Sequence, residues 1–143
     1  MRYVYPANVE RDEAGFWLVT FPDVPEAGTD GATREEALGE AQDALIAALG
    51  GYVEQRRPIP APSPVRRGQH GVSLPVLVSA KLALYQAMRE AGLSNTRLAE
   101  RLGVSETVVR RMLDLDHQTR IGHLERALAV LGKRLATEVL DAA

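Results

Sequence analysis

The sequence contains no cysteine, few aromatic residues and no long apolar run. The absence of cysteine from all 143 residues excludes disulfides and thiolate metal ligands. No stretch approaches the ~20 consecutive apolar residues that a membrane-spanning helix needs. With 45% hydrophobic and 25% charged residues, the composition is typical of a soluble globular protein. We therefore expect a cytoplasmic location and no membrane partner.

Signatures of catalysis are missing as well. There is no glycine-rich phosphate loop and no nucleophile elbow. His117 and His123 are six residues apart, which is not the spacing of a helical metal pair. Asp23 and other acidic residues fall in predicted turns, where aspartate is common, so a magnesium-dependent nuclease remains a minor alternative. We predict no catalytic residue, no metal and no cofactor.

Charge is distributed unevenly along the chain. Residues 1–57 carry 5 basic and 11 acidic side chains, whereas residues 58–143 carry 12 basic and 8 acidic ones. An acidic surface favours a basic protein partner, and a basic surface favours phosphate. Between the two halves, residues 56–71 read RRPIPAPSPVRRGQHG, and the alternating prolines predict an extended, semi-rigid spacer. We therefore predict an acidic domain at 1–57, a proline-rich linker at 58–71 and a basic domain at 72–143.

The first half predicts a small α+β domain. Alternating residues 3–9 favour a strand, and residues 16–21 (FWLVTF) favour a second strand that is covered on both faces. Residues 27–30 suit a short third strand. Thr33 and Glu36 form a capping box at the start of a helix that extends towards Arg56. The predicted order is β-β-β-α, with the apolar stripe of the helix packed on the sheet.

The second half predicts an all-α domain. Residues 72–74 suit a short strand, after which Pro75 opens a helix that ends near Gly92. Two short helices follow, and Thr119 is expected to cap a last helix that stops at Gly132. The tail after Gly132 is expected to form a short strand or a dimer arm.

Residues 94–113 (SNTRLAERLGVSETVVRRML) have the pattern of a helix-turn-helix. Gly103 stands where the chain must leave the first helix, and Ser105 can cap the second. Apolar residues follow helical spacing on both sides of the glycine: Leu98, Ala99, Leu102, Val104, Val108, Val109 and Met112. The second helix of such a motif enters the DNA major groove. The plainer interpretation is a helical hairpin within a core.

The candidates for DNA contact are the polar residues of this motif, which are Thr96, Arg97, Ser105, Glu106, Thr107, Arg110 and Arg111. Thr96 and Arg97 begin the first helix and are placed for phosphate contact. Arg110 or Arg111 can bond guanine O6 and N7 together, whereas Glu106 could accept from a cytosine amine or orient an arginine. Because such motifs usually bind paired half-sites, we expect a homodimer or a higher homo-oligomer, with residues 72–143 serving DNA binding and dimerisation.

Three sequence blocks together resemble the HicB-type antitoxins of HicA/HicB toxin–antitoxin systems. The first is FPDVPEAGTDGATREEAL at residues 21–38, which is similar to the family pattern FPDLPG…T-G-x-T-x-E-E-A. The second is VSLPVLVSAKLALYQAM at 72–88, behind the proline-rich hinge, and the third is the helix-turn-helix followed by LERALAVLGKRL at 124–135. Residues 25–27 are Pro-Glu-Ala where the family commonly has Pro-Gly-Cys, so the detailed turn is left open.

The resemblance implies a degenerate RNase H-like first domain of the β-β-β-α-β type, without nuclease activity. This domain would mask a small basic HicA-like toxin, an mRNA-cleaving ribonuclease, while the second domain would bind operator DNA and repress its own operon. The toxin-contacting residues are not readable from the sequence. The alternative is a stand-alone helix-turn-helix transcriptional regulator whose acidic domain senses a ligand or sets the oligomeric state.

Overall fold

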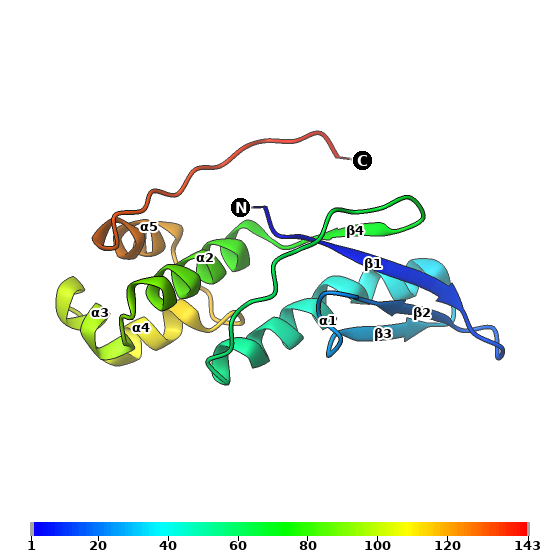
Figure 1. Ribbon diagram of the computed structural model, residues 1–143, viewed down its shortest axis with the longest axis horizontal. Helices are drawn as coiled ribbons and strands as arrows, with labels where there is room; N and C mark the ends of the chain where they lie inside the picture. The colour runs from blue at the N-terminus through cyan, green and yellow to red at the C-terminus, as the bar shows by residue number, and fades with distance from the viewer. Residues whose placement is uncertain (1, 143) are drawn as a thin grey trace. The chain divides into compact units, whose positions relative to one another are not determined.

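The chain folds into two compact units. The computed structural model describes residues 2–142, and the units divide between Ser79 and Ala80. Four strands and one helix belong wholly to the first unit: β1 (Val4–Arg11), β2 (Trp17–Thr20), β3 (Gly28–Gly31), α1 (Arg34–Glu54) and β4 (His70–Ser73). The division falls within α2 (Val76–Ala91), and the second unit continues with α3 (Asn95–Leu102), α4 (Glu106–Leu113) and α5 (Ile121–Val130) (Figure 1). The predicted α+β class is confirmed.

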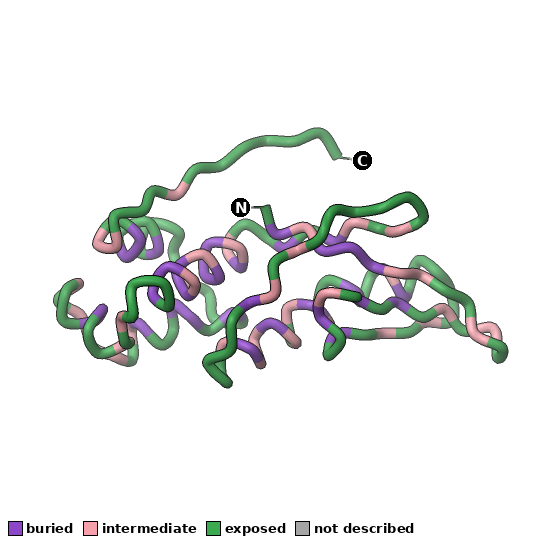
Figure 2. The backbone as a smooth tube through the Cα atoms, viewed as in Figure 1, coloured by how far each residue is buried: buried purple, intermediate pink, exposed green. Residues whose placement is uncertain are grey.

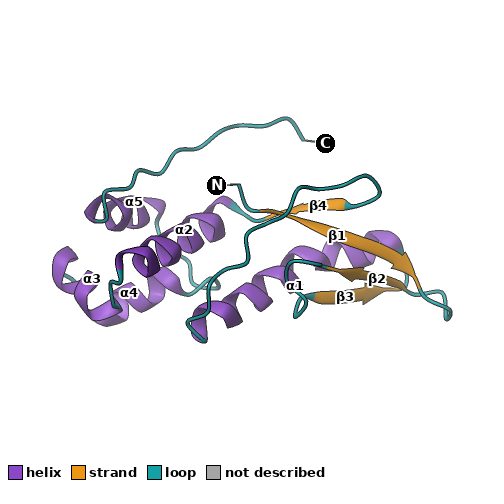
Figure 3. Ribbon diagram, viewed as in Figure 1, coloured by secondary structure: helices purple, strands orange, loops and turns teal. Residues whose placement is uncertain are grey.

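The four strands form one antiparallel sheet in the order β3-β2-β1-β4, and α1 packs along it (Figure 3). Val9 pairs with Val19, which pairs with Thr29, so these residues share one face. The apolar stripe of α1 is buried at Ala37, Ala41, Leu45, Leu49 and Tyr52. On β2, Val19 is fully buried whereas Leu18 is 36% exposed. The expectation that this strand is covered on both faces is therefore wrong, because successive side chains point to opposite faces and the face of Leu18 is exposed.

The start of α1 carries the capping box that its sequence predicts. Thr33 Oγ1 accepts a hydrogen bond from the Glu36 amide at 3.1 Å, and the Glu36 carboxylate accepts from the Ala32 amide at 3.0 Å. These bonds satisfy two amides that a helix N-terminus otherwise leaves without partners. The box therefore fixes where the chain turns from β3 into α1.

The fourth strand lies outside the predicted first domain. Residues 70–73 pair with β1, with Tyr5 opposite Val72 and Ala7 opposite His70. The element order is thus β-β-β-α-β, as the family resemblance implied, rather than the β-β-β-α order predicted from the residue pattern. The short strand predicted at the start of the second domain is part of the first unit instead, because its ladder partner is the first strand of the chain.

The proline-rich segment is also part of the first unit. The Tyr5 hydroxyl donates to the Pro60 carbonyl at 2.7 Å, and Ile59 is 6% exposed. The Ser63 amide and hydroxyl donate to the Asp23 carboxylate at 2.8 and 2.7 Å. Residues 58–71 were predicted to separate the two domains, whereas the structure divides the chain after Ser79. Proline pattern alone does not reveal these bonds, because they come from distant residues.

The second unit is a cluster of helices in which α3 contacts both α4 and α5. Leu84, Leu98, Val109 and Leu124 are fully buried. The last helix begins as predicted but is capped differently: its N-cap residue is Arg120, which makes no side-chain cap bond. Residues 133–142 form no helix or strand and are mostly exposed (Figure 2), so a strand in this part of the tail is not found.

None of the helices within residues 2–142 combines the length and the apolar character that crossing a bilayer requires.

Candidate functional site

The α3–α4 pair is built by local hydrogen bonds at each helix end. Ser94 Oγ accepts from the Arg97 amide at 3.1 Å and caps α3, and Ser105 Oγ accepts from the Val108 amide at 3.4 Å and caps α4. Between them Gly103 adopts φ 69°, the left-handed conformation that costs glycine least. The Val104 amide then donates to the Ala99 carbonyl at 3.0 Å. These bonds fix a tight turn between two helices of eight residues each.

The two helices bury one side and expose the other. Leu98, Ala99, Val109 and Met112 are at most 5% exposed. Of the seven residues predicted to contact DNA, six are exposed and Glu106 is half-buried. The exposed residues are Thr96, Arg97, Ser105, Thr107, Arg110 and Arg111. The sequence pattern therefore predicted surface positions correctly for six of the seven residues, and their contact with DNA stays a prediction.

Two of the candidate cations are paired with carboxylates on their own helices. Arg110 and Glu106 form an i,i+4 ion pair on α4, and Glu106 raises the pKa of Arg110 by accepting its hydrogen bond and by its negative charge. Arg97 lies 3.9 Å from Glu100 on α3. Exposed pairs of this kind contribute little to stability, so they orient the arginines more than they stabilise the fold.

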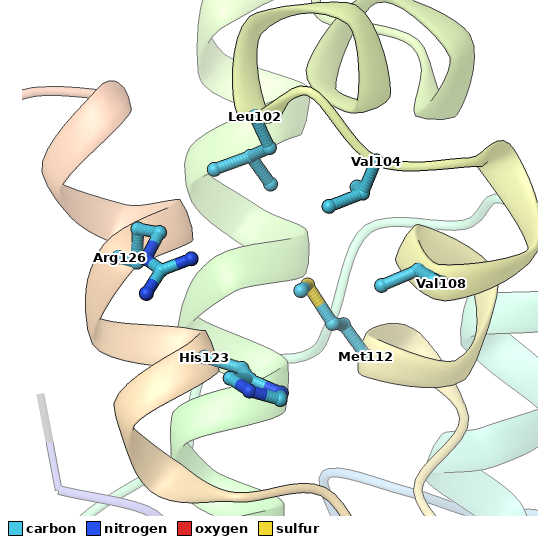
Figure 4. Close-up of a pocket in the computed structure, with 6 residues that line it drawn as sticks. All are labelled: Leu102, Val104, Val108, Met112, His123 and Arg126. Atoms are coloured by element: carbon cyan, nitrogen blue, oxygen red, sulfur yellow. The ribbon is translucent and has the colours of Figure 1, made fainter.

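A small open pocket lies beside the turn (Figure 4). Its apolar wall consists of Leu102, Val104, Val108 and Met112, and α5 adds His123 and Arg126, whose side chains extend towards it. His123 and Arg126 are exposed residues. Neither residue is among the predicted DNA contacts, because both follow the motif in the chain. Arg126 adds positive charge next to α4.

A buried lysine of α2 is the feature that sequence analysis missed. Lys81 is fully buried, and its Nζ donates to the carbonyls of Arg111, Asp114 and His117 and to Thr119 Oγ1, at 2.7 to 2.9 Å. Burial lowers the pKa of Lys81 to about 8, against the opposing effect of Asp114 and Asp116. The side chain is therefore an ammonium at neutral pH. The sequence signal that could have indicated this buried position is that Lys81 is the single charged residue within residues 75–88.

The first unit carries a polar cluster where α1 ends. The Tyr52 hydroxyl donates to the Glu26 carboxylate at 2.6 Å, and the Arg57 guanidinium lies 3.4 Å from Glu26 and over the Tyr52 ring. The hydrogen bond from Tyr52, more than the charge of Arg57, holds the pKa of Glu26 below its usual value. The cluster ties the turn before β3 to the end of α1.

The carboxylates of the first unit are not gathered into a metal site. Residues 2–142 contain no group of three or more histidine, aspartate or glutamate side chains that could hold a metal ion. Asp23, the residue that the nuclease alternative needs, accepts two hydrogen bonds from Ser63. In the structure, Asp23 anchors the proline-rich segment through these two bonds.

A family model described as the HicB_like antitoxin of bacterial toxin–antitoxin systems matches residues 4–83, from β1 into α2. The chain belongs to this family of antitoxins.

Individual relatives extend the similarity over the second unit. The chain is 46% identical over 131 residues to Antitoxin HicB 2 of Photorhabdus laumondii, with 92% of each chain covered. It is 38% identical over 138 residues to Antitoxin HicB of Pseudomonas fluorescens, covering 96% of this chain and 94% of the relative. It is 35% identical over 132 residues to Antitoxin HicB of Escherichia coli K12, covering 92% and 96% respectively. The predicted family is therefore confirmed along most of the chain.

Proposed function

We propose that this antitoxin neutralises a HicA-like toxin through its first unit and represses its own operon by binding operator DNA through its second unit. Family membership supports the antitoxin role. The division into two compact units supports two separate binding activities. Neither activity requires catalysis by this chain, and we expect none.

The DNA-binding half of the proposal treats α3 and α4 as a helix-turn-helix whose α4 enters the major groove. The observation that carries it is the two-sided character of α4, where Val109 and Met112 are buried while Arg110 and Arg111 are exposed. Exposed arginines on such a helix can bond a guanine edge with two parallel hydrogen bonds. Thr96 and Arg97 near the start of α3 would contact phosphates.

The toxin-binding half of the proposal is supported by charge. Residues 1–57 carry six more acidic than basic side chains. Glu35, Glu40 and Asp43 are exposed on α1, and Glu10 and Thr20 are exposed on the sheet. An acidic surface can compete with RNA for the basic surface of a ribonuclease, and opposite charges accelerate association. We propose a degenerate RNase H-like fold that covers the toxin, with contacts from α1 and the sheet.

We also propose a homodimer or a higher homo-oligomer. One short helix in one half-site gives limited affinity, whereas a two-fold dimer binds two half-sites at once. The tail after Gly132 supports self-association through its apolar residues, since Val139 is 99% and Leu140 is 60% exposed. Sedimentation of the purified chain would measure its mass. A monomer at working concentration would contradict this part of the proposal.

The test of the partner is purification of the native complex followed by mass measurement of its components. We expect a small basic protein to co-purify in a fixed ratio, and RNA cleavage by that protein to stop when the antitoxin is added. If the chain emerges alone from cells that encode no small basic neighbour, the stand-alone regulator is the better interpretation.

The test of the DNA contact uses Arg110→Ala and Arg111→Ala, measured on a duplex that spans the chain's own promoter. Loss of a bidentate base contact should weaken binding by about 1–3 kcal/mol and relax specificity at one base pair. Arg89→Ala is the matched control, because Arg89 is an exposed cation of the second unit that lies on α2 and outside α4. Toxin binding should stay unchanged in all three variants. Equal loss of DNA and toxin binding would refute the separation of the two activities.

A further inference from the structure

Lys81 occupies a position that natural proteins rarely give to a lysine. A charged side chain loses its hydration when it is buried and is tolerated only with well-placed partners. Within residues 2–142, Lys81 is the one charged residue that is buried, and its exposed fraction is 0%. It lies on α2, yet all four of its hydrogen-bond partners belong to residues 111–119, which run from the last turn of α4 to the segment before α5.

The four partners surround the ammonium with oxygen atoms. Nζ lies 2.9 Å from the Arg111 carbonyl, 2.7 Å from the Asp114 carbonyl, 2.8 Å from the His117 carbonyl and 2.8 Å from Thr119 Oγ1. An ammonium has three N–H donors and no acceptor, so the four oxygens require that one N–H is shared between two of them. The C-terminal carbonyls of a helix have no partners within the helix and carry partial negative charge, so a cation is favoured there.

The same network reaches one of the proposed DNA contacts directly. Thr119 Oγ1 accepts from Lys81 and donates to the Arg111 carbonyl at 3.4 Å, and it lies 3.3 Å from His117 Nδ1. The backbone carbonyl of Arg111 is thus hydrogen-bonded to Lys81 and Thr119, while the Arg111 side chain is exposed to solvent. A helix of only eight residues is marginal by itself, so its direction depends on what holds its two ends.

We propose that Lys81 is a positioning residue for DNA binding, which holds the C-terminal end of α4 and residues 114–119 so that Arg110 and Arg111 leave α4 in the direction that the groove requires. This inference rests on the proposed DNA-binding function. Ser105 fixes the other end of α4 through its cap bond. With both ends of α4 held, the backbone positions from which the exposed arginine side chains extend are fixed.

The test compares Lys81→Met with a variant of similar stability. Methionine keeps an unbranched chain of similar length but donates no hydrogen bond, so the carbonyls of Arg111, Asp114 and His117 lose their ammonium partner. Leu84→Ala, at a fully buried position of the same helix, destabilises the unit without touching these carbonyls. Arg89→Met removes an exposed positive charge from the same helix. All variants are compared at a temperature where circular dichroism shows them folded.

Binding to a labelled duplex of the chain's own promoter is the main measurement, with an unrelated duplex of equal length as reference. We expect Lys81→Met to bind the promoter at least about tenfold more weakly, which corresponds to about 1.4 kcal/mol. Leu84→Ala and Arg89→Met should stay within about threefold of the wild type, because the anchors of α4 are intact. Amide exchange should accelerate at residues 114–119 in Lys81→Met alone. Toxin binding should be the same in all four proteins.

A second variant keeps the test decisive if Lys81→Met does not fold. Thr119→Val removes one acceptor while keeping the ammonium and the shape of the side chain. We expect weaker promoter binding and faster amide exchange at residues 114–119, both smaller than for Lys81→Met. A folded Lys81→Met, or in its absence a folded Thr119→Val, that binds the promoter as tightly as the wild type would overturn the positioning role and leave the proposed function standing. If the wild type does not distinguish its promoter from the unrelated duplex, the proposed function fails and the positioning role with it.

Discussion

Replacing Gly31 by alanine should destabilise the first unit, because no space exists for a methyl group at the end of β3. An ideal Cβ at this position would lie 2.7 Å from the Ala37 amide nitrogen, 2.9 Å from Glu36 Cβ and 3.1 Å from the Thr33 carbonyl oxygen. Favourable contacts between carbon atoms lie at about 3.5–4.0 Å. Two of the three neighbours are backbone atoms in the first turn of α1, so a side-chain rotation cannot relieve the overlap.

The magnitude follows from two opposing effects. Overpacking of a rigid site costs about 1–3 kcal/mol, and backbone neighbours favour the upper end of that range. Replacing glycine reduces the entropy of the unfolded chain and returns about 0.4–1 kcal/mol. The net loss should be about 2 kcal/mol in the free energy of unfolding. For a unit of this size the melting temperature should fall by roughly 10 °C.

The assay can follow the first unit alone. Trp17 is the single tryptophan of the chain, and it lies directly opposite Gly31 in the β2–β3 ladder. Its fluorescence during urea unfolding therefore reports on the strand pair that the substitution disturbs. Gly28→Ala is the matched control in the same strand, because its Cβ would meet only the Val19 carbonyl, at 3.7 Å. Equal stability of the two variants would refute the close approach of α1 to β3.

Three further substitutions should give effects of predictable sign in urea or thermal unfolding. Gly39→Ala should stabilise the protein by about 0.5–1 kcal/mol, since Gly39 lies within α1 and a Cβ there would meet nothing within 4 Å. Gly103→Ala should cost about 1–2 kcal/mol despite equally open space, because φ is +69°. Tyr52→Phe should make stability less sensitive to acid. Because the pKa of Glu26 is lowered in the folded state, its contribution to stability is present above the pKa of the unfolded chain and is lost as pH falls through the folded-state pKa. The wild type should therefore lose more stability than the variant over this acidic range.

Elements with local signals could be predicted from the sequence. The capping box at Thr33, the cap at Ser105 and the turn at Gly103 are each set by a few neighbouring residues, and the structure contains all three. The exposed side of α4 followed from helical spacing alone. Periodicity is reliable here because each bond or contact joins residues within one or two turns of the chain.

Features that depend on distant partners could not be predicted in this way. The pairing of residues 70–73 with β1 joins segments more than sixty residues apart. The sequence of a four-residue strand does not indicate which other strand it pairs with. The prolines indicated an extended segment but not the hydrogen bond that it accepts from Tyr5 or the bonds that it donates to Asp23. Thr119 was expected to cap α5, but its hydroxyl instead accepts a hydrogen bond from Lys81. The other partners of Lys81 are backbone carbonyls, which every residue has, so the sequence could not indicate them.

The position of β4 determines how the first unit can be isolated. A fragment that stops at Arg57, before the prolines, would omit β4 and leave one side of β1 without its ladder partners. An uncovered strand edge is a template for pairing with other chains, so such a fragment should precipitate or associate at random. Extending the fragment through Ser79 would restore the missing strand, and protease digestion should likewise spare the proline-rich stretch despite its loop-like composition.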